Sequence, residues 1–162
     1  MTFDDIHEGA GVARHVTITG TRSVPAESAL PTVFDAYLRP FATPDAHFYM
    51  GGALGIDTAA LDWLAEHTRS ALTVAVPCTV DDQPPTAAEA IRQWRDVSRL
   101  DEVVELQADR LGTTAYHARN RWMVDRSAFV IGFPQGTDRA SGTWYTLSYA
   151  AERGMPRLIV PI

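Results

Sequence analysis

The stretch "YMGGALGIDTAALDWL", residues 49–64, joins the end of an apolar run to a helical pattern. It holds Gly51, Gly52 and Gly55 at the junction and Asp57 just after it. A strand-to-helix turn that brings backbone N–H groups close to an anion has no room for Cβ atoms, and the next helix points its positive end at the same place. The spacing is not the G-x-G-x-x-G of dinucleotide sites, so the glycines either reach a phosphate or only pack helix on strand. Asp57 is expected to cap free N–H groups or to accept a hydrogen bond from a ribose hydroxyl.

Outward from this stretch, apolar runs alternate with segments of helical periodicity. The apolar runs are continuous, which is typical of strands buried on both faces of a parallel sheet. We expect strands over residues 15–19, 46–50, 72–76, 102–106, 128–133 and 157–162, and helices over 25–39, 55–68, 86–99, 114–126 and 142–153. Thr86, with Glu89 three residues later, has the signature of a capping box. The pattern predicts an α/β fold, a three-layer Rossmann-like architecture with a mostly parallel sheet of about six strands and helices on both faces.

The length of 162 residues fits one domain. We expect a flexible N-terminal leader over residues 1–14 and a single Rossmann-like domain over residues 15–162. The net charge of −6 disfavours bulk attraction to nucleic acid but allows a local positive pocket. The single Cys78 excludes an internal disulfide and fits a reducing compartment. No apolar run reaches the roughly 20 residues of a membrane span, and no signal-peptide pattern is present, so we expect a cytoplasmic protein without a membrane partner.

Small and polar residues follow three of the predicted strands, at the ends where open α/β sheets bind their ligands. Besides the glycine stretch, these are "GTRS", residues 20–23, and "GFPQGTDRASGT", residues 132–143. We expect the three turns to converge on one anion. Their candidate ligand-binding residues are Gly20, Thr21, Arg22, Ser23, Gly51, Gly52, Gly55, Asp57, Ser141, Gly142 and Thr143.

Two further candidate ligands, Arg119 and Arg121, belong to "ARNR", residues 118–121, in the first half of a predicted helix. Positive charge there opposes the helix dipole, and a bound anion would relieve the opposition. Alternatively, both arginines are solvated surface residues. Their i, i+2 spacing points them in different directions, so we expect only one of them to face a pocket. An ion pair between Arg121 and Asp125 would leave Arg119 as the better anion ligand.

These motifs resemble the SLOG superfamily, which joins the DNA-processing proteins (DprA/Smf) to the Lonely-guy (LOG) proteins. "GTRS" resembles the Gly-Ser-Arg turn of the DprA group, and "GGALGIDTAALDWL" resembles its Gly-x-Ala-x-Gly-Ile-Asp-x-x-Ala-His stretch, with Leu61 in place of the His. "ARNR" and "SGTWYTLSYAAERGMPRLIVP" resemble two further DprA motifs, and the match runs from about Val16 to Pro161. The resemblance implies a Rossmann-like sheet, a pocket for a phosphorylated nucleotide or a related nucleoside derivative, and a homodimer.

The LOG branch is also similar, because "HARNRWMVDRSAFVIGFPQG" aligns without a gap on its His-Glu-Arg-Lys helix and Pro-Gly-Gly loop. This alignment places Arg119 on the LOG arginine thought to aid N-glycosidic cleavage. Thr146 stands where the catalytic glutamate of LOG would be. The resemblance therefore leaves the catalytic residues unassigned and the question of enzyme activity open.

Three functions stay open on these patterns. We favour binding of a nucleotide or phosphorylated nucleoside derivative, in a sensor or carrier role. A LOG-like nucleoside 5′-monophosphate phosphoribohydrolase is the first alternative. Single-stranded DNA binding, as in DprA, is the second, and the net charge disfavours it. No two histidines have His-x-x-x-His spacing, and we expect neither a metal nor a cofactor.

Overall fold

A parallel sheet with the strand order β4-β3-β2-β1-β5-β6 forms the centre of the fold. The structure is a computed structural model that describes residues 14–136 and 139–162, so the leader expected over residues 1–14 lies, apart from Arg14, outside the described residues. The strands are β1 (His15–Gly20), β2 (His47–Met50), β3 (Ala71–Val76), β4 (Glu102–Glu105), β5 (Phe129–Phe133) and β6 (Arg157–Ile159). The predicted α/β fold with a parallel sheet is confirmed.

Helices connect the strands throughout the described part of the chain. They are α2 (Leu30–Tyr37), α3 (Ile56–His67), α4 (Pro85–Asp96), α5 (Thr113–Asp125) and α6 (Gly142–Glu152), with short 3₁₀ helices η1 (Glu27–Ala29), η2 (Arg39–Phe41) and η3 (Val80–Asp82). The single helix expected over residues 25–39 is divided into η1 and α2. Pro31 lies in the first turn of α2, where its missing N–H costs little, and Pro40 lies in η2 after that helix has ended.

The capping box predicted at Thr86 is wrong. Helix α4 begins one residue earlier, at Pro85, and its N-cap has no side-chain hydrogen bond. The fixed φ of Pro85 suits the first turn of a helix, so α4 begins at Pro85 and Thr86 lies inside it. The structure instead forms a capping box at η3, where the Asp82 carboxylate accepts a hydrogen bond from the backbone N–H of Thr79 at 3.2 Å.

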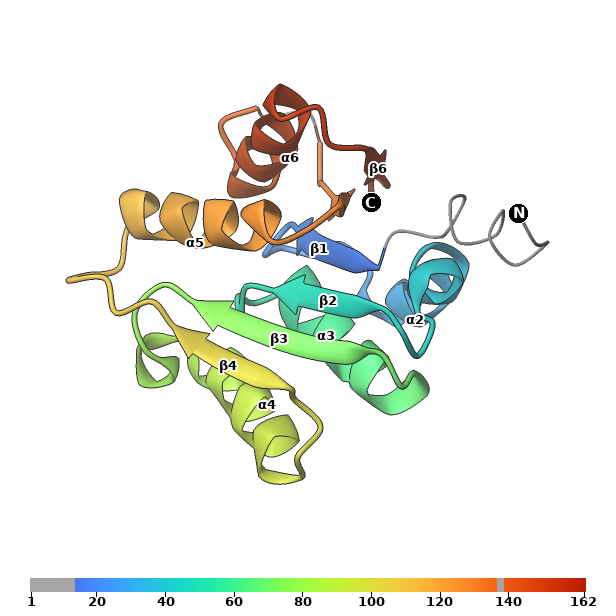
Figure 1. The fold of residues 1–162 in the computed structure, drawn as a ribbon, viewed down its shortest axis with the longest axis horizontal. Coiled ribbons are helices and arrows are strands. Elements are labelled where there is room, and N and C mark those ends of the chain that lie inside the picture. The colour runs from blue at the N-terminus through green and yellow to red at the C-terminus, as the bar shows by residue number, and fades with distance from the viewer. Residues whose placement is uncertain (1–13, 137–138) are drawn as a thin grey trace, which may run out of the picture.

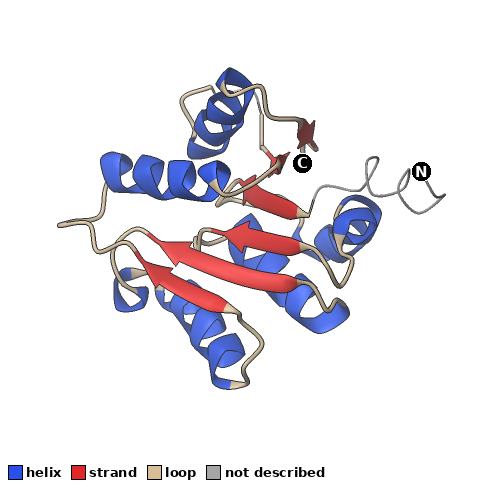
Figure 2. Cartoon of the chain, viewed as in Figure 1, coloured by secondary structure: helices blue, strands red, loops and turns tan. Residues whose placement is uncertain are grey.

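The strand order creates a reversal between β1 and β5. The chain passes outward from β1 through β2 and β3 to β4, and α5 then returns it to β5 on the other side of β1. Helices α2, α3 and α4 cover one face of the sheet, and α5 and α6 cover the other (Figure 1; Figure 2). Open α/β sheets bind ligands beyond the carboxyl ends of the strands at such a reversal.

Each face of the sheet has its own apolar core. On the side of α2, α3 and α4, the buried residues Phe34, Leu64 and Ile91 belong to one cluster with residues of the strands. On the other side, Leu147 of α6 and Met123 of α5 are buried in two smaller clusters. Burial of apolar surface is the main favourable term in folding, and here it fixes the strand ends that carry the candidate site. Within residues 14–136 and 139–162, no helix has the length and hydropathy that crossing a bilayer requires.

Candidate functional site

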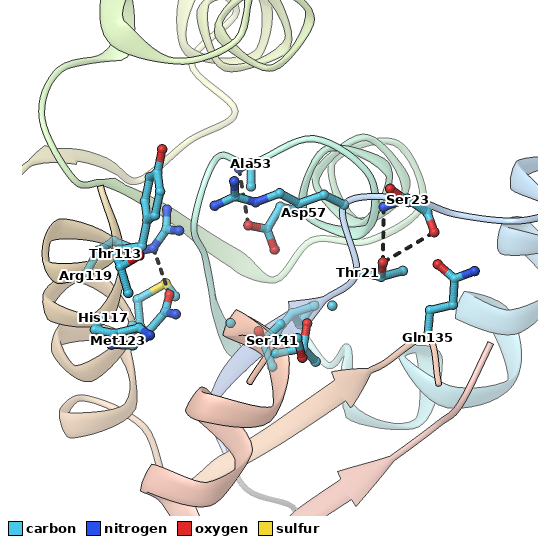
Figure 3. A pocket seen from close by; sticks show the side chains of 18 of the residues that line it. Thr21, Ser23, Ala53, Asp57, Thr113, His117, Arg119, Met123, Gln135 and Ser141 are labelled. Atoms are coloured by element: carbon cyan, nitrogen blue, oxygen red, sulfur yellow. Dashed lines mark hydrogen bonds between the residues drawn. The ribbon is translucent and has the colours of Figure 1, made fainter. Parts of the chain in front are cut away.

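A cavity of about 430 Å³ lies at the carboxyl end of β1, between the amino-terminal parts of α5 and α6 (Figure 3). We call it the polar cavity. Of the residues predicted from the sequence, its wall contains Gly20, Thr21, Arg22, Ser23, Asp57, Arg119, Ser141, Gly142 and Thr143. These residues come from the turn after β1, the first turns of α3 and α6, and the middle of α5, as expected for a site at the reversal of the sheet.

The amino-terminal end of α6 supplies hydrogen-bond donors to the polar cavity. The Ser141 hydroxyl caps the helix by accepting a hydrogen bond from the backbone N–H of Trp144 at 3.3 Å. The backbone N–H groups of Gly142 and Thr143 have no partner within the described part of the chain, nor does the Thr143 hydroxyl. Thr143 is only 6% exposed and lines the cavity. Unpaired N–H groups and the positive end of the helix dipole favour an anion here.

The turn after β1 is fixed by backbone hydrogen bonds. The Thr21 N–H donates to the Phe133 carbonyl at 3.0 Å, and the Ile56 N–H donates to the Thr21 carbonyl at 3.1 Å. Arg22 projects from this turn with its guanidinium carbon 4.6 Å from the centre of the Tyr116 ring. Arg22 is exposed and, among the described residues, has no ion-pair partner. Its charge is therefore available to a ligand.

Arg119 is the buried cation of the polar cavity. Only 4% exposed, it donates from Nη1 to the Gly51 carbonyl and from Nε to the Asn120 amide oxygen at 2.8 Å. Burial lowers the pKa of Arg119, and the negative charge of Asp57 opposes that shift. The Arg119 guanidinium stays protonated at neutral pH because its ordinary pKa is so high. The buried charge is thus held mainly by carbonyl and amide oxygens.

Asp57 is the carboxylate in the cavity wall, and it is 8% exposed. It accepts a hydrogen bond from the Ala53 N–H at 3.2 Å, so it caps a loop N–H as one of the two expected roles requires. Burial raises the pKa of Asp57, while the charges of Arg119 and Arg22 and the hydrogen bond from Ala53 lower it. A buried carboxyl with a raised pKa beside two cations in a cavity is typical of functional sites.

The three glycines of the opening stretch do not line the polar cavity. A Cβ at Gly51 would lie 2.6 Å from Nη1 of Arg119, so this glycine makes room for the guanidinium. Gly55 has a φ of +76°, and a Cβ there would lie 2.4 Å from the Thr21 carbonyl oxygen. Gly52 faces core side chains of the α4 side, among them Ile91. The three glycines therefore leave room for groups that pack next to the site, and they do not line the cavity themselves.

Arg121 also lies outside the cavity wall. Its Nη1 donates to the Tyr145 hydroxyl at 2.7 Å, and the ring of Tyr145 stacks on His117 with centroids 3.5 Å apart. The ion pair of Arg121 with Asp125 that the spacing allows is not formed among the described residues, where Asp125 pairs with Arg153 at 3.2 Å. Only one arginine of the "ARNR" segment thus faces the cavity, as the i, i+2 spacing predicted. Burial and the neighbouring charge of Arg121 lower the pKa of His117, which lines the cavity.

Sequence reasoning missed Tyr116, Asn120 and Gln135, which also line the polar cavity. Tyr116 precedes Arg119 by three residues, so the two side chains share one face of α5. That spacing is the signal that identifies Tyr116 from the sequence. Gln135 lies in the loop after β5, and no periodic pattern indicates where a loop side chain points.

Comparisons with known proteins establish the fold. The chain is similar to DNA processing protein A from Helicobacter pylori, a structure described for its single-stranded DNA binding mode, with a TM-score of 0.66 and 22% identity over 93% of this chain and 66% of that one. It is also similar to DNA processing protein A (DprA) from Streptococcus pneumoniae, with a TM-score of 0.67 and 22% identity over 91% of this chain and 50% of that one. The fold is DprA-like. No family model matches the sequence, and no curated protein matches it.

The DprA-like fold bears out the resemblance to that group at the level of the Rossmann-like domain. This chain spans 66% and 50% of the two DprA chains, so the likeness concerns one part of each. Thr146, at the position of the LOG glutamate, is fully buried and its hydroxyl donates to the Gly142 carbonyl at 3.0 Å. Among the described lining residues of the cavity, Asp57 is the carboxylate. In residues 14–136 and 139–162, no group of three His, Cys, Asp or Glu is placed to hold a metal ion.

Proposed function

We propose that the polar cavity binds a nucleotide or a phosphorylated nucleoside derivative, and that the protein acts as a sensor or carrier of this ligand. The observation that carries the proposal is the meeting of two backbone N–H groups, those of Gly142 and Thr143, with the cations Arg22 and Arg119 in one cavity; both N–H groups are unpaired among the residues that the structure describes. A phosphate satisfies both the donors and the charges, as phosphates do at helix amino termini.

The rest of the cavity suits the sugar of such a ligand. Its volume of about 430 Å³ lies in the range of small-molecule sites. Asp57 is held by the Ala53 N–H and has a second oxygen that can accept a hydrogen bond from a ribose hydroxyl. The Thr21 hydroxyl and the Ser141 hydroxyl add neutral polar groups to the wall. A phosphate flanked by hydroxyl groups is the chemistry that this surface complements.

Calorimetry tests the proposal with inorganic phosphate, ribose 5-phosphate and a panel of nucleoside mono-, di- and triphosphates. Arg22→Ala should weaken binding of every phosphorylated ligand by about tenfold or more, because a charge-assisted hydrogen bond is lost. The matched control is Arg126→Ala. Arg126 is likewise exposed and stacks on an aromatic side chain of α5, with its guanidinium carbon 3.8 Å from the Trp122 ring centre, outside the cavity. No binding by the wild-type protein at millimolar ligand, or equal losses in the two variants, would remove the proposal.

Single-stranded DNA binding is a second candidate, favoured by the likeness to the H. pylori protein. A phosphate of the strand would then take the place of the nucleotide phosphate. The net charge of −6 opposes the binding of a long anionic backbone. A gel shift with an oligodeoxynucleotide at low salt, followed by a salt titration, separates the two: strand binding gives a complex whose affinity falls steeply with salt.

Hydrolysis of a nucleoside 5′-monophosphate is a third candidate, favoured by the presence of Asp57 in the cavity wall. With a raised pKa, its carboxyl is suited to hold or deliver a proton near a leaving base. Incubation of the protein with AMP and related monophosphates should then release free base, and Asp57→Asn should abolish the release. No free base at high enzyme concentration counts against hydrolysis and leaves binding unaffected.

A further inference from the structure

A second cavity, of about 350 Å³, adjoins the polar cavity. We call it the apolar chamber. The two cavities share four wall residues, Arg22, Ala53, Tyr116 and Arg119. The remaining wall of the apolar chamber consists of Leu54, Asp82, Gln83, Pro84, Pro85 and Leu111. The two spaces therefore adjoin along these four residues.

Exposed apolar side chains gather at the apolar chamber. Leu54 is 38% exposed and Leu111 is 40% exposed. Among the described residues, only Tyr37 and Val97 are further large apolar side chains with comparable exposure. Single exposed apolar residues are common on protein surfaces, but two on opposite turns that line one cavity leave apolar surface for a ligand to cover.

The residues shared by the two cavities combine an aromatic ring with two cations. The guanidinium of Arg22 lies over the ring of Tyr116 at 4.6 Å, and that of Arg119 lies 6.0 Å from the same ring. A guanidinium beside a tyrosine ring offers a surface on which a further aromatic group packs favourably. The same Arg22 faces the polar cavity, so a phosphate there and a ring in the apolar chamber would contact one side chain.

Gln83 belongs to the wall of the apolar chamber and carries a side-chain amide. Its Nε2 donates to the Gly52 carbonyl at 2.7 Å, and this fixes the amide orientation because a carbonyl only accepts. The Oε1 atom of Gln83 consequently points elsewhere and has no partner within the described residues. Every common nucleobase carries at least one N–H donor on its edge, whereas an aliphatic group carries none.

We propose that the apolar chamber is the nucleobase subsite for the ligand whose phosphate lies in the polar cavity. This inference rests on the proposed function. The base packs between Leu54, Leu111 and the Arg22–Tyr116 stack, and donates a hydrogen bond to Oε1 of Gln83. The ligand class is therefore a nucleotide rather than a bare sugar phosphate.

A third cavity, between α2 and α3, is a weaker alternative for the base. It shares only Arg22 with the polar cavity, so a ligand would have to pass around that side chain. Three carboxylates, those of Glu27, Asp62 and Glu66, line it. They repel a phosphorylated ligand, whereas the described lining residues of the apolar chamber include one carboxylate, that of Asp82, which is hydrogen-bonded to Thr79.

Calorimetry with AMP, GMP, CMP, UMP and ribose 5-phosphate tests this subsite. The wild-type protein should bind at least one nucleoside monophosphate about tenfold or more tightly than ribose 5-phosphate, because only the former buries a base. The double variant Leu54→Ala/Leu111→Ala should lose most of that difference and bind ribose 5-phosphate within about twofold of the wild type. Val97→Ala, a truncation of an exposed apolar residue outside all three cavities, is the control.

The outcomes distinguish this inference from the function on which it rests. Equal affinity of the wild type for ribose 5-phosphate and every nucleotide overturns the base subsite alone. An equal loss for both kinds of ligand in the double variant does the same. If no phosphorylated ligand binds, the proposed function fails and the subsite with it. The single variant Leu111→Ala, checked by circular dichroism, gives the answer where the double variant does not fold, because Leu111 lines the apolar chamber and not the third cavity.

Discussion

Gly51 and Gly55 lie in one loop, and the absence of a side chain at each leaves space for a different neighbour. At Gly51 the space is filled by the guanidinium of Arg119, which approaches from 68 residues along the chain. At Gly55 the backbone has a φ of +76° and packs against the Thr21 carbonyl. One glycine therefore positions a buried cation, and the other fixes the start of α3 against the turn that carries Arg22.

Gly55→Ala should destabilise the protein by about 2 kcal/mol or more. The new Cβ would be strained by the positive φ and would lie 2.4 Å from a backbone oxygen that cannot move away cheaply. Urea unfolding measures the change in the free energy of unfolding. Gly142→Ala is the matched control at another helix start, because a Cβ there meets nothing within 4 Å. Similar stability of the two variants contradicts the steric role of Gly55.

At the scale of elements, the alternation of strands and helices was predictable because each depends on neighbouring residues. The continuous apolar run of β5 and the periodic pattern of α3 identify both elements and their approximate ends. The start of α4 was missed because Pro85 overrides the capping signature of Thr86. The hydrogen bond from Arg119 to Gly51 was also missed, because a contact across 68 residues leaves no periodic signal in the sequence.

Substitutions at Ser141, the N-cap of α6, can separate the effect of helix capping on stability from the effect on ligand binding. Ser141→Ala removes the acceptor for the Trp144 N–H and should cost about 1 kcal/mol of stability. Ser141→Asp keeps an acceptor and suits the helix dipole, so its stability should match that of the wild type. Its carboxylate nevertheless repels an anion at Gly142 and should weaken phosphate binding by about tenfold or more.

Urea unfolding and calorimetry on the two Ser141 variants check this prediction. The expected pattern is opposite in the two measurements, with the alanine variant less stable and the aspartate variant weaker in binding. Unchanged affinity for ribose 5-phosphate in Ser141→Asp means that the phosphate does not lie at the amino-terminal end of α6.

Across the whole molecule, the ligand-facing groups and the cluster around His47 lie at opposite ends of the sheet. The polar cavity is at the carboxyl ends of the strands. At the amino ends, His47 stacks on Tyr49 with ring centroids 4.5 Å apart, lies 5.6 Å from the ring of His15, and shares a 2.7 Å hydrogen bond with the Thr73 hydroxyl. A pH effect on stability from this cluster is therefore separable from a pH effect on binding.

Stability should fall as the pH drops below about 6.5 in a way that depends on His47. Burial lowers the pKa of His47 below its ordinary value of 6.5, and the charge of His15 adds to the shift while Asp101 opposes it. Between the lowered pKa and 6.5 the unfolded chain binds more protons than the folded one, so acid favours unfolding. The contribution is complete above pH 6.5 and is lost as the pH falls through the folded pKa. Urea midpoints at pH 7.5 and pH 5 should differ more for the wild type than for His47→Gln, in which an amide replaces the titrating ring beside Thr73. Equal differences in the two proteins mean that His47 does not carry this dependence.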